Sequence, residues 1–173
     1  RYMFLTQKGY AWQQSPHHQI ICDKLMQVYN GEIQNLIINI PPRYSKTQLA
    51  VIYFIAWALG NHPDCEFIHS SYSSTLASNN SSQIRDLLQS EEYQAIFNTR
   101  LKDDSKAKDH WKTTQGGVMY ATGAGGTITG FGAGKLRDGF GGAIIIDDPH
   151  KADEARSETM RSNVINWFTE TIK

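Results

Sequence analysis

The sequence Ile40-Pro41-Pro42-Arg43-Tyr44-Ser45-Lys46-Thr47 lies between two apolar runs. The first run, residues 36–40, predicts a buried strand, and the second, residues 48–59, predicts a buried helix. A strand, a tight loop ending in Lys-Thr and a helix follow one another in this order in phosphate-binding loops, whose backbone N–H groups surround a polyphosphate. We therefore expect a nucleotide site where the loop meets the helix.

Lys46 and Thr47 would carry the chemistry of this loop, because the lysine reaches the outer phosphates and the hydroxyl binds Mg²⁺. Their neighbours would complete the nucleotide-binding loop: Pro42, Arg43, Tyr44, Ser45 and Gln48. The usual pattern G-x-x-x-x-G-K-[ST] has glycine where this chain has Ile40 and Ser45. For the loop taken alone, a structural turn before a helix therefore stays open as the alternative.

A glutamine upstream of the loop, Gln19, is a candidate contact to the adenine ring, since several P-loop ATPases place a glutamine there. It begins a segment, residues 19–29, whose apolar side chains recur at helical spacing and which ends at Asn30-Gly31. The preceding His17 and His18 are interpreted as surface or capping residues, because no cysteine or carboxylate cluster completes a zinc site.

The composition is that of an ordinary soluble globular domain. The 173 residues are 40% hydrophobic and 20% charged, and the formal net charge is zero. Zero charge excludes a global basic field for nucleic acid, although it leaves open a local patch or DNA contacts on other subunits. Cys22 and Cys65 have no motif spacing and indicate free buried thiols. The chain starts at Arg1 and stops inside a helical pattern, so we expect a fragment of a longer protein.

The middle of the chain predicts further α/β structure. Residues 65–69 read as a second strand, and the serine-rich stretch after it leads into a helix up to residue 88, which makes a βα unit. Residues 91–97 predict a short helix, and residues 98–109 an exposed loop. Eleven of the fourteen glycines fall within residues 116–142, where we expect short strands or hairpins.

Asp147 and Asp148 directly follow an apolar run, residues 143–146, that predicts a buried parallel strand. An ATPase needs one carboxylate there to hold Mg²⁺ and another to polarise the attacking water. A turn or helix cap is the alternative, because Asp-Asp-Pro suits both. Together with Lys46 and Thr47 about a hundred residues earlier, the pair favours an ATPase in which Thr47 and Asp147 share Mg²⁺ and Asp148 is catalytic.

The last stretch, residues 153–172, predicts a helix with one apolar stripe that packs in the core. The stripe consists of Met160, Val164, Trp167, Phe168 and Ile172.

Several motifs in this order resemble the large terminase subunit of tailed bacteriophages, the DNA-packaging ATPase. They are Pro41-Pro42-Arg43 before the loop lysine, Ser71-Tyr72-Ser73-Ser74-Thr75-Leu76-Ala77 after the second strand, Thr127-Ile128-Thr129-Gly130, and Ile145-Ile146-Asp147-Asp148-Pro149-His150-Lys151. The resemblance extends from about residue 10 to the end of the chain. Two positions depart from the usual pattern, since Ser45 replaces a glycine and Asp148 stands where a glutamate is common.

The resemblance implies one α/β domain over residues 1–173, a P-loop NTPase of the ASCE type with a mostly parallel central sheet flanked by helices. It implies hydrolysis of ATP to ADP and phosphate, with Mg²⁺, to drive double-stranded DNA into a procapsid. The implied partners are the portal protein, the small terminase subunit and other copies of the chain in a homo-oligomeric ring, on the procapsid in the host cytoplasm. The family's carboxyl-terminal nuclease domain is not visible in this sequence, so we expect no nuclease chemistry.

Ring ATPases usually complete the site with an arginine from a neighbouring subunit. Arg137, on the glycine-rich stretch before the Asp147 strand, is the first candidate, and Arg43 is a candidate for acting on the γ-phosphate of its own subunit. A solvated surface arginine is the alternative for each. Two other functions stay open, a helicase-like or other P-loop ATPase on nucleic acid and a non-catalytic nucleotide-binding assembly module.

Overall fold

The computed structural model describes residues 11–105, 107–128, 130–151 and 153–172, and it is built on a four-stranded sheet with strand order β2-β3-β1-β4. The strands are β1 (Glu66–Ser71), β2 (His110–Lys112), β3 (Val118–Gly123) and β4 (Gly142–Asp147). Residues 1–10 of the expected domain and Thr129 of the glycine-rich motif lie outside the described residues.

The sheet is mixed, which corrects the prediction of a mostly parallel sheet. β1 pairs in parallel with both β3 and β4, whereas β2 pairs antiparallel with β3. The difference arises at β2, because only residues 113–117 separate it from β3 and so short a connection joins antiparallel strands. Of these two strands, β3 lies in the glycine-rich stretch and is short as expected, whereas β2 precedes that stretch. The predicted α/β class is confirmed.

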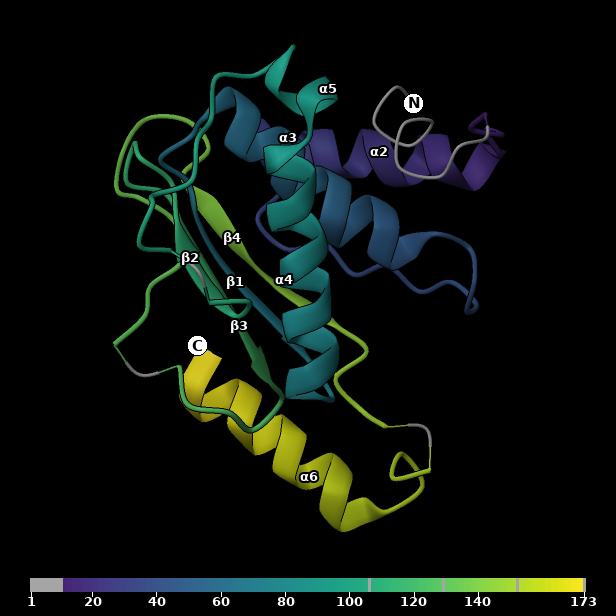
Figure 1. Cartoon of the computed structure of the whole chain (residues 1–173). Helices are drawn as coiled ribbons and strands as arrows, with labels where there is room; N and C mark the ends of the chain where they lie inside the picture. Colours follow the sequence, from purple (N-terminus) through teal and green to yellow (C-terminus); the bar gives the residue numbers. More distant parts are fainter. Residues whose placement is uncertain (1–10, 106, 129, 152, 173) are drawn as a thin grey trace.

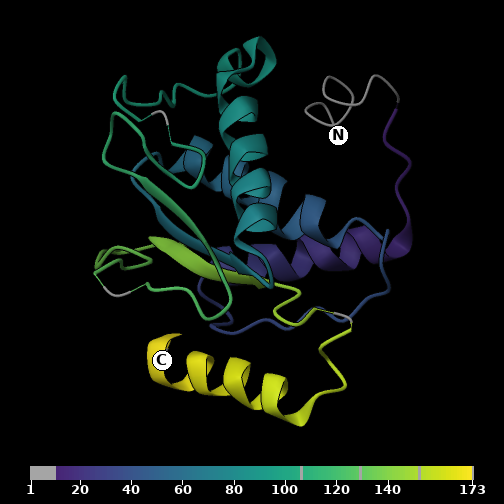
Figure 2. The ribbon, with the colours of Figure 1, turned by 60° about the horizontal axis from the view of Figure 1, so that its bottom comes forward.

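Helices cover the two faces of the sheet unequally (Figures 1 and 2). One face carries α2 (Pro16–Tyr29), α4 (Ser74–Gln89) and the continuous helix made of η1 (Thr47–Tyr53) and α3 (Phe54–Asn61); α5 (Glu91–Gln94) follows α4. The other face carries α6 (Glu158–Trp167), which continues into η2 (Phe168–Ile172). In the described residues, no helix combines the length and apolar character that a membrane crossing requires.

Side-chain alternation along β1 explains these layers. Phe67 is in register with Met119 and Ala143, and all three pack in the core under the larger group of helices. The next residue, Ile68, points to the opposite face, where α6 lies, and is 1% exposed. The sheet is therefore apolar on both faces at β1, which is its most buried strand.

The first helix, α2, ends before Asn30-Gly31 as predicted but begins at Pro16 rather than at residue 19. The ring of His18 accepts a hydrogen bond from the backbone N–H of Ser15 at 3.1 Å, so His18 caps α2 as expected. Gly31, with φ +76°, follows the end of that helix in the left-handed conformation that glycine adopts readily. The hydroxyl of Ser73 caps α4.

The run before the loop, residues 35–40, does not form the predicted strand. Leu36, Ile38 and Ile40 pack against the core from partly buried positions, while Ile37 is 85% exposed. The expectation that the run is buried therefore holds only in part, since Ile37 is exposed. The prediction of a strand is wrong, because these residues pair with no strand of the described sheet, whose edge on this side is β4.

The carboxyl-terminal helix is less buried than predicted. It begins at Glu158 rather than at residue 153, because the hydroxyl of Ser157 caps it. Trp167 is buried, but Met160 is 36% and Phe168 is 39% exposed, so the apolar stripe packs only in part. α6 lies alone on its face of the sheet, where no second helix of the described chain covers the rest of the stripe. Likewise β4 is parallel as predicted but forms an edge of the sheet, with Ile144 37% exposed.

Both cysteines are free, as predicted. Cys65 is buried, whereas Cys22 is exposed, which corrects the expectation that both thiols are buried.

Candidate functional site

The beginning of η1 meets the carboxyl end of β4, so that residues about a hundred positions apart come together. The hydroxyl of Thr47 donates a hydrogen bond to Oδ2 of Asp147 at 2.6 Å. The ammonium group of Lys46 forms an ion pair with Asp148 and lies 3.6 Å from Oδ1 of Asp147. The structure thus brings together the four residues that the sequence selected for phosphate and Mg²⁺ chemistry.

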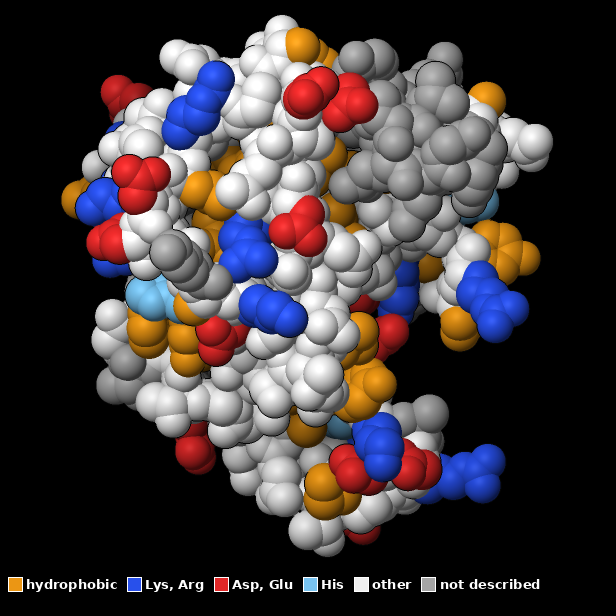
Figure 3. Space-filling view, in the orientation of Figure 1, with side chains coloured by type: hydrophobic (Ala, Val, Ile, Leu, Met, Phe, Trp, Pro, Cys, Tyr) orange, Lys and Arg blue, Asp and Glu red, His pale blue; other side chains and the backbone are white. Residues whose placement is uncertain are grey.

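These four side chains differ in exposure and do not balance in charge. The side chain of Asp147 is 10% exposed and that of Lys46 is 20% exposed, while Asp148 is 57% exposed. One ammonium group between two carboxylate groups leaves an excess of one negative charge. In the space-filling view, side chains of both charges line a notch on the right side of the molecule (Figure 3).

Unusual backbone geometry is concentrated at this site. Among the described residues other than glycine, positive φ angles occur at Arg43 (69°), Ser45 (63°) and Asp148 (46°). The left-handed conformation costs a residue with a side chain about 1–2 kcal/mol. Ser45 stands where the usual pattern has glycine, so the loop keeps a glycine-like backbone with a serine in it. Such strain persists where the surroundings impose it, and it is common at functional sites.

The helix that follows the loop has an irregular first part. At its start, the backbone N–H of Leu49 donates a hydrogen bond to the carbonyl of Ser45 at 2.9 Å. The seven residues of η1 are π-helical, a rare form that often marks functional sites. The side-chain Nε2 of Gln48, a predicted loop residue, is buried and has no described hydrogen-bond partner.

The remaining loop residues are open to solvent. Pro42 and Arg43 are exposed, and Tyr44 is 49% exposed. The ring of His17 at the start of α2 lies 5.3 Å from that of Tyr44, so α2 borders the loop. Arg43 is therefore free to reach a ligand from the same subunit.

Gln19 lies on α2 but is engaged locally. Its amide accepts a hydrogen bond from Gln14 at 2.6 Å and donates one to Asp23 at 2.7 Å. Neither bond reaches the loop, so an adenine contact would require this exposed side chain to turn.

Arg137 lies at the opposite end of the sheet from Lys46. Its guanidinium group donates to both carboxylate oxygens of Asp64, at 2.8 and 2.7 Å, and to the carbonyl of Phe140 at 2.6 Å. Asp64 and Phe140 precede β1 and β4, whose other ends carry the site, and a six-residue strand is about 20 Å long. Arg137 therefore ties the amino ends of two strands together and is remote from the site of its own subunit. Its predicted action on a neighbouring subunit stays a prediction.

A buried histidine lies between the two ends of the sheet. The ring of His69 lies with Nδ1 3.1 Å from the carbonyl of Ile145 and Nε2 3.1 Å from the amide of Asn80. The carbonyl can only accept, so Nδ1 carries the proton and Nε2 accepts from the amide. Burial lowers the pKa of His69, so the ring is held neutral and links α4 to β1 and β4.

Ser71 belongs to the serine-rich motif after the second strand, but the sequence did not identify it as a site residue. It ends β1 in register with Asp147, is 0% exposed, and its hydroxyl has no described hydrogen-bond partner. A strand ending in two serines is visible in the sequence, but only the register tells which of them faces Asp147.

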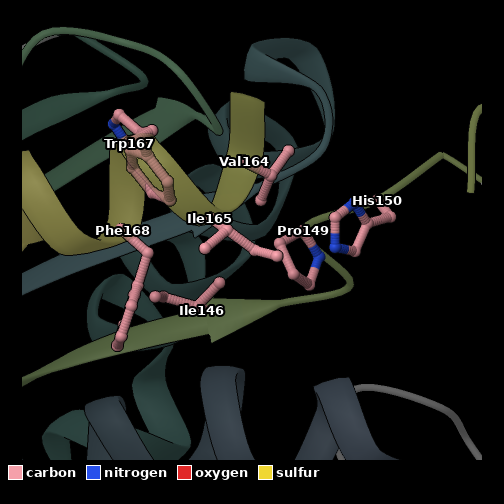
Figure 4. A pocket seen from close by; sticks show the side chains of 7 residues that line it. All are labelled: Ile146, Pro149, His150, Val164, Ile165, Trp167 and Phe168. Atoms are coloured by element: carbon pink, nitrogen blue, oxygen red, sulfur yellow. The ribbon is translucent and has the colours of Figure 1, made fainter. Parts of the chain in front are cut away.

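A second hollow lies near β4 but on the other face of the sheet. This apolar groove of about 190 Å³ is bounded by Ile146, Pro149, His150, Val164, Ile165, Trp167 and Phe168 (Figure 4). Its apolar lining does not suit phosphate groups. The groove lies between β4 and α6, and Lys46 is not among the residues that line it. The charged cluster, not this groove, is the candidate functional site.

The donors at the site fit Mg²⁺ bound together with a nucleotide. Mg²⁺ prefers oxygen ligands and is often held by one or two carboxylates, substrate phosphates and water. Thr47 and Asp147 supply a hydroxyl and a carboxylate within hydrogen-bond distance of each other. In the described part of the chain, no group of three or more His, Cys, Asp or Glu side chains could hold a metal ion. A hydroxyl and a carboxylate are oxygen donors of the kind that suit a divalent cation whose other ligands are phosphates and water.

No family model matches this chain, and no curated protein and no solved structure matches it either. The case for a function rests on the sequence motifs and on the geometry of the site.

Proposed function

We propose that this chain is the ATPase domain of a DNA-packaging motor, similar to the large terminase subunit of tailed bacteriophages and with a P-loop NTPase fold of the ASCE type. The observation that carries the proposal is the contact of Lys46 and Thr47 with Asp147 and Asp148 across a hundred residues of sequence. A structural turn or helix cap would not require the two motifs to meet.

Lys46 has two alternative partners in this proposal. In the structure its ammonium group is paired with Asp148. The outer phosphates of ATP compete for that ammonium group, and Asp148 is then released at the exposed rim of the site. Its free carboxylate can accept a hydrogen bond from the water that attacks the γ-phosphate and so orient it.

Thr47 and Asp147 are the residues that would hold Mg²⁺. When bound, the cation supplies positive charge that stabilises the negative charge developing on the transferred phosphoryl group. Asp147 is nearly buried at the end of β4, so its position is fixed by the sheet. Arg43, exposed on the strained loop, would contact the γ-phosphate from the same subunit.

The partners follow from the sequence resemblance. They are double-stranded DNA, the portal protein, the small terminase subunit and further copies of the chain in a ring, on the procapsid in the host cytoplasm. A helicase-like ATPase would share the site, and the two differ in whether the longer protein packages DNA or unwinds it.

Phosphate release by the assembled ring, with DNA and Mg²⁺, tests the enzymatic part. Lys46→Ala removes the phosphate-binding ammonium group, and Lys135→Ala is a matched control that removes an ammonium group paired with Glu66 at the other end of the sheet. We expect Lys46→Ala alone to abolish turnover. If wild-type protein releases no more phosphate than Lys46→Ala, the chain is no ATPase; retained nucleotide binding without turnover then indicates an assembly module.

A further inference from the structure

Two adjacent serines end β1, and neither hydroxyl has a described hydrogen-bond partner. Ser70 and Ser71 are both 0% exposed. A buried hydroxyl without a partner costs free energy, and such groups are rare in native proteins. One explanation is a ligand or water that completes the hydrogen bonds when the site is in use.

The two serines face opposite sides of the sheet. Ser71 is in register with Asp147, and Ser70 is in register with Ile146. Residues in register on parallel strands share a face, and successive residues alternate between faces. Ile146 borders the groove under α6 (Figure 4), so Ser70 faces α6. Asp147 contacts Thr47, so Ser71 faces the charged site.

The spacing between Ser71 and Asp147 suits a bridging water. Neighbouring strands lie about 4.8 Å apart, and two hydrogen bonds of about 2.8 Å can span that separation through one water molecule. Thr47 binds Oδ2 of Asp147, and Oδ1, which lies 3.6 Å from the Lys46 ammonium group, can still accept a hydrogen bond. A serine hydroxyl can both donate and accept, so it can orient such a water.

On the opposite side, Ser71 is flanked by a residue without a side chain. Gly123 is in register with it on β3, and a Cβ at Gly123 would lie 3.0 Å from the backbone nitrogen of Ser74. The first turn of α4 therefore lies so close to β3 that a side chain at this position would be crowded. On the other neighbouring strand, Asp147 is the charged residue in register with Ser71.

We propose that Ser71 is a positioning residue of the cation site, whose hydroxyl orients the water through which Asp147 holds a divalent cation bound to a nucleoside triphosphate. The inference rests on the proposed function, because it requires an Mg²⁺-nucleotide at Lys46 and Thr47. The hydroxyl contacts the metal's water rather than the reacting phosphate.

Binding of a fluorescent ATP analogue to the full chain, titrated with Mg²⁺ and repeated with EDTA, tests this role. Ser70→Ala is the matched control, because it removes an equally buried hydroxyl from the next residue on the opposite face. We expect Ser71→Ala to raise the Mg²⁺ concentration for half-maximal binding about tenfold or more, since loss of a group that orients metal ligands typically costs 10–100-fold in metal affinity. Binding in EDTA should not change, and Ser70→Ala should leave both measurements at the wild-type level.

Urea unfolding without nucleotide or Mg²⁺ separates this role from a structural one. If the hydroxyl has no partner in the ligand-free protein, Ser71→Ala unfolds at the same urea concentration as wild type or a higher one. An unfolded or clearly less stable Ser71→Ala, beside a normal Ser70→Ala, would mean that the hydroxyl has a structural partner and would overturn the inference. The near-isosteric Ser71→Cys should show the same loss of Mg²⁺ response in a folded protein.

The inference and the proposed function can fail separately. If Lys46→Ala abolishes nucleotide binding and Ser71→Ala responds to Mg²⁺ like Ser70→Ala, the role of Ser71 is wrong and the nucleotide site stands. If the wild-type chain binds no nucleotide with or without Mg²⁺, both are wrong.

Discussion

The two ends of the same sheet both carry pairs of opposite charges, and they differ in whether those charges are satisfied. At the amino ends of the strands Arg137 pairs with Asp64 at 2.7 Å, and Lys135 lies 3.7 Å from Glu66. Each charge there has one opposite partner. At the carboxyl ends a single ammonium group, that of Lys46, faces two carboxylates.

The carboxyl ends also carry features that cost folding free energy. Ser45 and Asp148 have left-handed backbones, and the buried hydroxyl of Ser71 lacks a described partner. At the amino ends Arg137 donates hydrogen bonds to Asp64 and to the carbonyl of Phe140. The comparison indicates that one end is built to hold strands together and the other to receive a ligand.

Replacing the lysine at each end by alanine should give the largest difference in ATP hydrolysis. We expect Lys46→Ala to lower ATP hydrolysis by about 10²-fold or more, because a charged donor to the transferring phosphoryl group is lost. Lys135→Ala, which breaks a partly exposed pair, should cost at most about 1 kcal/mol of stability. Phosphate release and urea unfolding of both variants check this; equal hydrolysis by the two would remove the distinction between the ends.

Arg137→Ala should act mainly on stability. The guanidinium group loses an aspartate and a backbone carbonyl, and hydrogen bonds to charged groups contribute about 1.5–3 kcal/mol each when well formed, less where solvent reaches them. We expect a loss of about 1–3 kcal/mol in the free energy of unfolding, measured in urea.

A mixture of Arg137→Ala and Lys46→Ala subunits tests the predicted action of Arg137 across a subunit interface. For that action the guanidinium group must leave Asp64. Activity regained in the mixture would show that Arg137 acts on a neighbouring subunit. In the urea measurement, unchanged stability of Arg137→Ala would contradict its role in holding the amino ends of the strands together.

Relief of loop strain gives a smaller effect at the carboxyl ends. Ser45→Gly places the residue that tolerates φ near 63° at that position, so we expect about 1 kcal/mol of added stability after the entropy cost of glycine. Ser45→Ala keeps the strain and serves as the control. A Ser45→Gly protein no more stable than Ser45→Ala in thermal unfolding would mean that the serine is not strained.

The smallest effect is on pH dependence and concerns His69, midway between the two ends. Burial lowers its pKa in the folded protein below the ordinary value of about 6.5. The unfolded chain therefore takes up the proton first, so stability is fully present above about pH 6.5 and falls as pH drops below it. An NMR titration of the His69 ring should give a midpoint below 6.5; a midpoint at or above 6.5 would contradict its buried, neutral role.

The sequence predicted the meeting of Lys46 and Thr47 with Asp147 because the two motifs together are typical of an ATPase site. The helix after β1 was also predicted, since a serine-rich stretch leads from a buried strand into a helical pattern. These features depend on local signals and on motifs that share one chemistry.

Other features depend on contacts that the sequence does not encode locally. The apolar character of Ile38 and Ile40 indicates burial, but whether their segment forms a strand depends on a neighbouring strand. Arg137 lies on a glycine-rich stretch that returns to the amino ends of the strands. No local sequence pattern predicts that return. The face of Ser71 depends on register, because a shift by one residue would turn it away from Asp147.

A crystal structure of the chain with a non-hydrolysable ATP analogue and Mg²⁺ tests the central claim most directly. The account predicts one cation between the hydroxyl of Thr47 and the carboxylate of Asp147, with the ammonium group of Lys46 on the outer phosphates and no longer on Asp148. A nucleotide bound elsewhere, with the Lys46–Asp148 ion pair intact, would contradict it.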